Sequence, residues 1–210
     1  MKKYTKAELE LIYESRRTAL FNYMKEHNIT AAVFEDTEGR RNPAIRYFTG
    51  HPTDALWVCA SNGKNVLCPW DENLAKQMAV NVKIIPSSKY DRITTKAVYE
   101  ILKSFKLKGK LKLDLPPETP YPLFLKYLTE LDGWDILCRE ESVHDFVVKQ
   151  RTCKDEYEIE GTKEAARIGN IIIEEIEKGI KDKSIKTESD VALFIEKECR
   201  KHGCECTGFD

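Results

Sequence analysis

The sequence lacks the features that direct a protein to a membrane or to a polyanion. Its 34 Lys and Arg residues almost balance its 35 Asp and Glu residues, so the chain as a whole has no electrostatic reason to bind nucleic acid or an anionic membrane. No apolar run approaches the roughly 20 residues of a membrane-spanning helix, and the polar N-terminus does not resemble a signal peptide. We therefore expect a cytoplasmic protein without a nucleic-acid or membrane partner.

The seven cysteines do not form an even disulfide framework. Cys59, Cys68 and Cys138 lie inside apolar, strand-like runs, which is typical of reduced thiols in a cytosolic protein. Cys153 and Cys59 have no histidine at a recognisable spacing, so we interpret them as structural. His202, Cys204 and Cys206 could form a metal site, but they supply three ligands where structural zinc normally has four. A histidine in the last turn of a helix also suits the helix dipole.

The first 140 residues alternate between strand-like and helix-like patterns, with no internal repeat or low-complexity segment. A capping box at Thr5-Lys6-Ala7-Glu8 predicts a helix that ends near His27-Asn28, and further helices are predicted to follow Asp71, Asp91 and Pro122. Apolar runs predict strands over 29–34, 45–49, 55–60, 66–70, 82–85, 111–115 and 134–138. This alternation indicates an α/β fold with a mixed, roughly six-stranded sheet and helices on both faces.

Two local patterns refine this picture. Asn62-Gly63 lies between two apolar runs and predicts a hairpin with a type I′ turn, which needs positive φ at both central residues. Lysines alternate with leucines over 108–115, a period-2 pattern that favours the solvated face of a strand over a phosphate-binding patch.

Strand patterns stop at Glu141, and three helices are predicted, over 141–150, 154–180 and from Thr187 to Cys199. We divide the chain into a domain over 1–140, a linker helix region over 141–153 and a helical segment over 154–210. The last two helices have apolar faces that the remaining chain is too short to cover. We expect these faces to pack on each other, on the first domain or on another copy.

Several motifs, in order, resemble one family. Ile45-Arg46-Tyr47-Phe48-Thr49-Gly50, followed by Ala55-Leu56-Trp57-Val58, resembles the creatinase/prolidase N-terminal domain. Arg151-Thr152-Cys153-Lys154, Glu158-Ile159 and Ala165-Ala166 look like the opening of the pita-bread catalytic domain that follows it. Thr187-Glu188, Val191 and Gly208-Phe209-Asp210 fit the second helix and first strand of that domain. The resemblance covers essentially the whole chain.

The resemblance implies a longer parent protein with metallopeptidase activity. In Xaa-Pro aminopeptidases and prolidases, two divalent metal ions (Mn, Co or Zn) are held by two Asp, one His and two Glu, which would lie beyond Asp210. The parent would remove a residue that precedes proline, or split Xaa-Pro dipeptides, as a homodimer acting on peptides with proline in second position. This chain alone would bind no metal ion and hydrolyse nothing.

Two other functions remain open at this point. One is part of a creatinase-like hydrolase, which has the same architecture but needs no metal. The other is a non-catalytic module, in which the domain serves only to dimerise or to bind partners.

The candidate site residues concentrate in the charged loop over 35–43. By the resemblance, this loop leans over the active site of the other subunit, where the carboxylates of Asp36 or Glu38 would meet a substrate amine and Arg40 or Arg41 its carboxylate. An ordinary solvated loop remains the alternative. His51 and Trp70 are lesser candidates for the same substrate-gating role, since such rings at strand ends are often structural.

Overall fold

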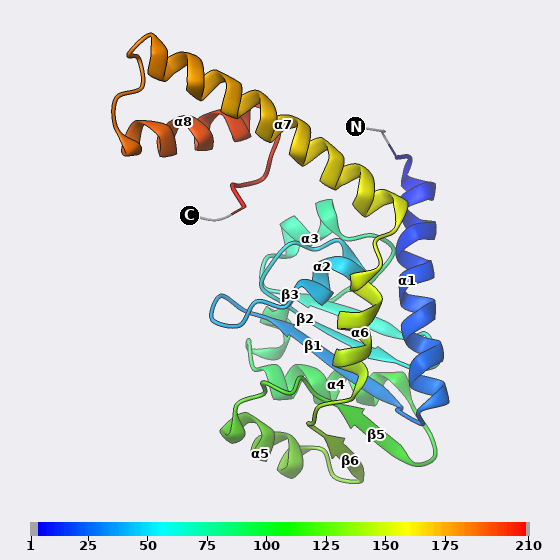
Figure 1. Ribbon diagram of the computed structural model, residues 1–210. Coiled ribbons are helices and arrows are strands. Elements are labelled where there is room, and N and C mark those ends of the chain that lie inside the picture. The colour runs from blue at the N-terminus through cyan, green and yellow to red at the C-terminus, as the bar shows by residue number, and fades with distance from the viewer. Residues whose placement is uncertain (1–3, 209–210) are drawn as a thin grey trace. The chain divides into compact units, whose positions relative to one another are not determined.

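The computed structural model describes residues 4–208, which form two compact units. We name Tyr4–Cys153 the sheet unit and the part that begins at Lys154 the helical unit (Figure 1). Residues 209 and 210, on which the predicted catalytic strand partly falls, lie outside the described range. Over residues 4–208, no helix is both long enough and apolar enough to cross a membrane.

A six-stranded mixed sheet forms the middle of the sheet unit, with the strand order β4-β3-β2-β1-β5-β6. The β1–β2 and β2–β3 pairs are antiparallel, whereas β3–β4, β1–β5 and β5–β6 are parallel. The predicted mixed α/β fold class is thereby confirmed. The strands are β1 Ala31–Asp36, β2 Ala55–Ala60, β3 Asn65–Pro69, β4 Lys83–Ile84, β5 Leu111–Asp114 and β6 Trp134–Leu137.

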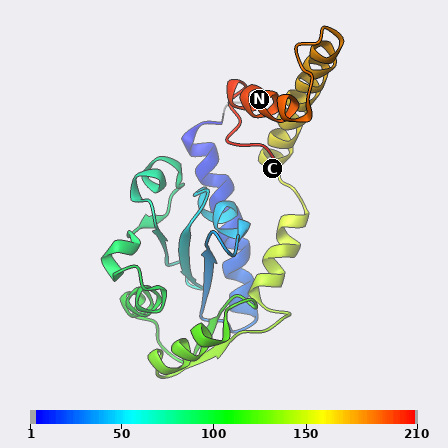
Figure 2. The same cartoon turned by 90° about the vertical axis from the view of Figure 1, so that its left-hand side faces the viewer.

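Helices cover both faces of this sheet. They are α1 Lys6–Glu26, α2 Pro43–Thr49, α3 Glu72–Met78, α4 Thr94–Phe105, α5 Tyr121–Glu130 and α6 Val143–Thr152, with a short 3-10 helix, η1, over Ser87–Tyr90. Neighbouring residues of a strand point to opposite faces of the sheet. Accordingly, Ala32 and Phe34 of β1 pack with α1, α2 and α6, whereas Ala31 and Val33 pack with α4 and α5. Figure 2 shows the sheet nearly edge-on between these two layers.

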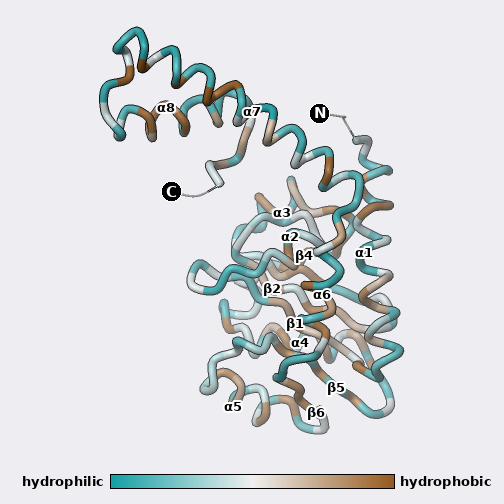
Figure 3. Tube along the Cα trace, viewed as in Figure 1, coloured by the Kyte–Doolittle hydropathy of each residue, from teal (hydrophilic) through white to brown (hydrophobic). Residues whose placement is uncertain are grey.

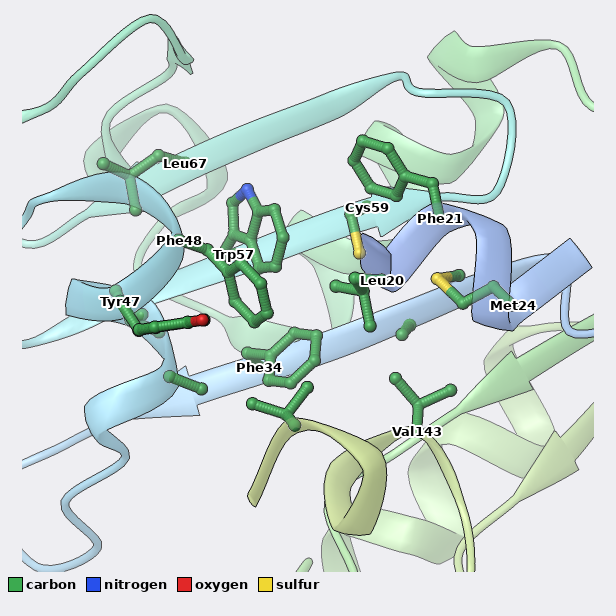
Figure 4. Close-up of a cluster of buried hydrophobic side chains, with 14 of the residues drawn as sticks. Leu20, Phe21, Met24, Phe34, Tyr47, Phe48, Trp57, Cys59, Leu67 and Val143 are labelled. Atoms are coloured by element: carbon green, nitrogen blue, oxygen red, sulfur yellow. The ribbon is translucent and has the colours of Figure 1, made fainter. Parts of the chain in front are cut away.

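An aromatic cluster fills the face that α1, α2 and α6 cover (Figure 4). The Trp57 ring stacks on Phe48, with centroids 5.0 Å apart, and lies 5.3 Å from Phe34. All three side chains are fully buried, and the Trp57 indole Nε1 donates to Oδ1 of Asn65 over 3.3 Å. Large buried rings of this kind dominate the free energy of folding of a small domain.

Helix α1 also holds the short helix α2 in place. The Thr5–Glu8 capping box begins α1 as predicted. Two buried arginines of α1 then reach the carbonyl oxygens at the end of α2, with Arg16 Nη1 donating to Tyr47 and Arg17 Nη1 to Phe48 over 3.0 and 2.8 Å. Cations suit the carbonyl end of a helix, so these contacts fix the position of α2 beside the sheet.

The predicted strand over 45–49 is wrong, because this segment is helix α2. Its aromatic and β-branched residues favour a strand by propensity, but its ends specify a helix. Asn42 Oδ1 accepts the amide of Ala44 over 3.1 Å, Pro43 occupies the first turn, and Gly50 closes the helix at a φ of 78°. A helix of seven residues is too short for its period to be recognised in the sequence.

Two smaller predictions are corrected. The hairpin between β2 and β3 exists, but its turn is not type I′, since Gly63 has a positive φ and Asn62 does not. The Gly63 amide donates to the Ala60 carbonyl over 2.9 Å, which indicates a type I turn closed by a left-handed glycine. Helix α4 begins at Thr94 rather than directly after Asp91, which has a left-handed φ of 56° at the end of η1.

The helical unit consists of α7 Glu156–Lys181 and α8 Glu188–Lys201. Asp155 with Glu158 and Thr187 with Asp190 form capping boxes that begin the two helices. The buried apolar side chains of this unit are those of Ile168, Ile172 and Ile185. Several other large apolar side chains of the unit are exposed, namely Ile173, Ile180 and Leu193.

Candidate functional site

A short, tightly bonded loop over residues 37–42 joins β1 to α2. It projects from the sheet unit in Figure 1 and is hydrophilic in Figure 3. Thr37 and Arg40 exchange two backbone hydrogen bonds of 3.1 and 3.0 Å. The buried carboxylate of Asp36 joins the two ends of the loop, because its Oδ1 accepts a hydrogen bond from the Asn42 amide over 2.8 Å. The loop is thus preorganised, with Glu38 and Gly39 exposed at its tip.

Both loop arginines have partners inside the sheet unit. Arg40 Nη2 contacts Oε2 of Glu35 over 2.5 Å, and the Glu35 carboxylate also accepts the Thr94 hydroxyl over 3.1 Å. Arg41 Nη1 donates to the Thr53 hydroxyl and to Asp54 Oδ1 over 2.6 and 2.9 Å. The two predicted arginines therefore stabilise the conformation of the loop through these contacts. The side chain of Arg41 is nevertheless half-exposed.

His51 and Trp70, the two predicted residues outside the loop, differ in their exposure to solvent. His51 is only 1% exposed, and neither ring nitrogen makes a hydrogen bond of normal geometry. Burial lowers the pKa of His51, although the Thr53 backbone and nearby carboxylates oppose the shift. Trp70, in contrast, is 56% exposed, and the Arg92 guanidinium lies 4.3 Å from the centre of its ring. Trp70 can contact a ligand, whereas His51 is a neutral core residue.

Three of the predicted residues meet in a pocket of about 390 Å³, which we name the acidic pocket. Asp36, Glu38 and Trp70 line it, together with Glu35 and Asp54. Other lining residues were not predicted: Leu56, Cys68, Ser87, Arg92, Ile93, Thr94 and Ala97 among them. Sequence patterns do not reveal this pocket because it is assembled from strand ends, η1 and the start of α4, which only the fold brings together.

A second pocket of about 340 Å³ lies against the same loop, and we name it the arginine pocket. Arg40, Arg41 and Arg151 line it, with the carboxylates of Glu35 and Glu118. His51 lines neither pocket. Within the loop, Glu38 thus lines the acidic pocket and Arg40 and Arg41 line the arginine pocket, whereas Glu35 lines both.

His144, which also lines the arginine pocket, forms a buried pair with Asp114. Nε2 of His144 lies 3.6 Å from Oδ1 of Asp114, and neither atom has a hydrogen bond of normal geometry. Burial raises the pKa of Asp114 to about 7, against the opposing effect of nearby Ser142, and lowers the pKa of His144 to about 4. Burial therefore disfavours the charged form of both side chains.

The described residues offer no metal centre. No group of three or more His, Cys, Asp or Glu side chains within residues 4–208 is arranged to hold a metal ion. Burial raises the pKa of the Cys59 thiol and raises that of Cys68 to about 12. Both thiols are therefore protonated at neutral pH and are poor nucleophiles.

Comparison with known proteins identifies the fold. No protein-family model and no curated protein matches the sequence, but solved structures do. The sheet and helices belong to the fold class found in solved X-Pro aminopeptidases and prolidases.

Three solved structures illustrate the likeness. The X-Pro aminopeptidase of Thermotoga maritima has a TM-score of 0.72 and 22% identity, over 91% of this chain and 51% of that one. A prolidase of Thermococcus sibiricus has a TM-score of 0.66 and 18% identity, over 94% and 52%. The N-terminal domain of the FACT complex subunit SPT16 from chickpea, Cicer arietinum, has a TM-score of 0.54 and 13% identity, over 94% and 53%. The chain spans about half the length of each structure.

Proposed function

We propose that this chain is the N-terminal, substrate-gating and dimerising part of a cytoplasmic Xaa-Pro aminopeptidase- or dipeptidase-like metallohydrolase. The observation that carries this proposal is the match to the Thermotoga maritima X-Pro aminopeptidase over 91% of the chain at a TM-score of 0.72. The matching prolidase supports the same class of activity.

In this proposal the loop over 37–42 and Trp70 meet peptide substrate. Glu38 at the loop tip and half-exposed Arg41 present opposite charges, which suit the two charged ends of a short peptide. Asp36 and Arg40 hold the loop in shape through their contacts with Asn42 and Glu35. His51 is buried. Of the six predicted gating residues, the exposed ones are Glu38, Arg41 and Trp70.

The metal site belongs to another part of the proposed parent. Two divalent ions, Mn, Co or Zn, would need ligands from outside residues 4–208, because the described residues contain no suitable cluster. When bound, such ions supply a hydroxide nucleophile for peptide hydrolysis at neutral pH. The chain itself contributes the loop, the two pockets and a dimer contact.

Mass measurement and peptide hydrolysis test this proposal. Size-exclusion chromatography with light scattering between about 1 and 100 µM is expected to give a dimer, and a monomer throughout that range would contradict the inter-subunit gating role. Incubation of the 210-residue chain with Mn²⁺ or Co²⁺ and either Gly-Pro or a longer Xaa-Pro peptide is expected to give no turnover. Robust metal-dependent hydrolysis would refute the assignment of the chemistry to another part of the parent.

The SPT16 match favours a second candidate function, a non-catalytic interaction module. That structure is described as part of a complex subunit, and 94% of this chain aligns with it. This alternative would be supported if the chain, as a monomer or a dimer, selectively retained a protein partner and neither bound nor processed Xaa-Pro peptides. The higher TM-score of the aminopeptidase makes the peptidase proposal the stronger one.

A further inference from the structure

Helix α8 ends in a turn that brings two cysteines together. Its C-cap is His202, and Gly203 follows with a left-handed φ of 82°, where the chain turns away from the helix (Figure 1). The Cys204 amide donates to the Cys199 carbonyl over 2.9 Å. The Gly203 amide donates to the Arg200 carbonyl over 3.0 Å. These two hydrogen bonds define a Schellman motif, in which Cys199 and Cys204 occupy the positions whose side chains commonly touch.

The distance between the two backbones suits a disulfide. An amide nitrogen lies about 1.5 Å from its own Cα, and a carbonyl oxygen lies about 2.4 Å from its own. Because the hydrogen bond measures 2.9 Å, the Cα atoms of Cys199 and Cys204 are at most about 6.8 Å apart. Disulfides join residues whose Cα atoms lie about 4.4–6.8 Å apart. The motif therefore holds the two cysteines at a bridging distance before any bond forms.

The side chains of the two cysteines also interact. Partial burial raises the pKa of the Cys199 thiol, and the Cys204 side chain raises it further through its charge and a hydrogen bond, with Cys206 adding to the shift. A hydrogen bond between two thiols requires their sulfur atoms to be neighbours. All three cysteines are free thiols, and Cys199 and Cys204 are partly exposed whereas Cys206 is exposed. A small reagent can therefore reach this group from solvent.

A disulfide fits the group better than a metal ion does. Within residues 4–208, no group of three or more His, Cys, Asp or Glu side chains is arranged to hold a metal ion. A disulfide needs only two sulfur atoms, and the turn at the end of α8 supplies both.

We propose that the end of α8 is a redox-sensitive modification site, at which Cys199 and Cys204 form a disulfide by exchange with a small disulfide such as oxidised glutathione. One cysteine thiolate attacks the small disulfide, which releases one small thiol and leaves a mixed disulfide on the protein. The thiolate of the other cysteine then attacks the protein sulfur of that bond and releases the second small thiol. The two cysteines thus lose two electrons and two protons, which reduce the small disulfide to two thiols.

The disulfide fastens the end of a weakly packed helix. In the described helical unit the buried apolar side chains are those of Ile168, Ile172 and Ile185, so the hydrogen bonds at the end of α8 can open locally at low cost. A covalent link between Cys199 and Cys204 opposes this opening. In a reducing compartment the pair stays reduced and closes when the small disulfide accumulates. The site needs no peptide substrate, metal ion or dimer, so it goes beyond the proposed function.

Tryptic peptide mapping of the 210-residue chain tests the proposal. Trypsin cleaves after Arg200 and Lys201, so Cys199 and Cys204 fall on separate peptides. After incubation with oxidised glutathione and blocking of the remaining thiols, mass spectrometry is expected to find these two peptides joined by a disulfide. Dithiothreitol is expected to separate them. Absence of the joined peptides with oxidised glutathione in excess would overturn the proposal.

Variants identify the pair, since Cys204 and Cys206 lie on the same tryptic peptide. Cys206→Ser is the matched control and is expected to give the joined peptides at the yield of the unmodified chain. Cys204→Ser is expected to lower that yield about tenfold, because Cys206 lies outside the hydrogen-bonded turn. Unchanged circular dichroism spectra establish that each variant is folded. Equal yields in the two variants would overturn the assignment of the bridge to Cys199 and Cys204.

Hydrogen exchange measures the effect of the bridge on the turn. The amides of Gly203 and Cys204 are expected to exchange about tenfold more slowly in the oxidised chain than in the reduced chain. Amides of β2, in the sheet unit, are the internal control and are expected to keep their rates. Equal rates for Gly203 and Cys204 in the two chains would overturn the inferred fastening of α8.

Discussion

The sheet unit and the helical unit differ in how much apolar side chain each one buries. The sheet unit has a continuous core on each face of its sheet, whereas Ile168, Ile172 and Ile185 are the buried apolar residues of the described helical unit. Both units have well-formed capping boxes. Local helix signals are thus equally good in the two units, and what separates them is the free energy available from packing.

This difference predicts where substitutions will matter. Caps and helix propensity each contribute about 1 kcal/mol or less, so the helical unit depends on a small buried surface. A pair of helices of this size buries too little apolar area for high stability by itself. The sheet unit, in contrast, has the aromatic cluster around Trp57.

The largest expected contrast comes from removing one apolar side chain from each unit. Phe34→Ala leaves a cavity between Phe48 and Trp57 and is expected to cost about 3–5 kcal/mol. Leu193→Ala removes a side chain that is mostly exposed in α8 and is expected to cost less than about 0.5 kcal/mol.

Urea unfolding measures both effects. The three tryptophans, Trp57, Trp70 and Trp134, all lie in the sheet unit, so fluorescence follows that unit and circular dichroism follows both. A cost below about 1 kcal/mol for Phe34→Ala would show that the aromatic cluster contributes little, which would contradict the contrast between the units.

Much of the sheet unit was predictable, since long apolar runs with turn signals between them mark strands such as β2 and β3. The capping patterns at Thr5, Asp71 and Thr187 also identified their helices correctly. Helix α2 was missed because tertiary contacts, namely those of Arg16 and Arg17 with its carbonyl end, help to hold two turns whose residues favour a strand.

The site was predictable only in part. Charge and turn residues directed attention to the loop over 35–43, and Trp70 stood out as a ring at a strand end. Nothing local in the sequence indicates that Ser87, Arg92 and Ile93 come together with Glu38, because their proximity depends on η1 and α4 packing beside β3. The burial of His51 likewise follows from the helical rather than extended course of the preceding segment.

A second contrast uses two glycines. Gly50 ends α2 at a φ of 78°, and an added Cβ would lie 2.7 Å from the Met78 carbonyl oxygen. Gly50→Ala is expected to cost about 2–4 kcal/mol, from the left-handed conformation together with the clash with rigid backbone. At Gly179 of α7 the added Cβ would lie 2.7 Å from the side chain of Ile185 and 3.2 Å from the Ser184 hydroxyl oxygen, both of them side-chain atoms.

The Gly179→Ala substitution therefore has opposing effects. Alanine favours the helix by about 1 kcal/mol, and the Ile185 side chain must move aside. We expect a net change within about 1 kcal/mol, measured from the thermal unfolding followed by circular dichroism. Equal losses in the two variants would show that the left-handed conformation and the backbone clash at Gly50 do not set its cost.

A third contrast is a pH dependence built into the sheet unit, which cancels in the unmodified protein. Burial raises the pKa of Asp114 from 3.8 to about 7 and lowers that of His144 from 6.5 to about 4. Between about pH 4 and 6.5 the folded pair holds one proton, on Asp114, and the unfolded chain also holds one, on the histidine. Because the proton counts are equal, the pair adds no slope to the stability there.

Single variants should reveal the opposing contributions of His144 and Asp114 to the pH dependence of stability. In Asp114→Asn, the unfolded chain binds a proton on His144 that the folded chain does not, so stability is expected to rise with pH from about 4 to 6.5. In His144→Phe, the folded chain alone keeps the Asp114 proton, so stability is present at low pH and is lost as the pH rises toward 7. Each slope is expected to reach at most about 1.4 kcal/mol per pH unit.

Urea unfolding at pH 4.5, 5.5 and 6.5, followed by tryptophan fluorescence, measures these slopes in the sheet unit. The exposed Glu164–Arg167 ion pair of α7 provides the comparison, because exposed pairs contribute little and are screened by salt. Arg167→Gln should therefore leave the fluorescence-detected slope unchanged. If the slopes of Asp114→Asn and His144→Phe have the same sign, the two groups do not share one proton in the folded protein. The assigned protonation states of this buried pair would then be wrong.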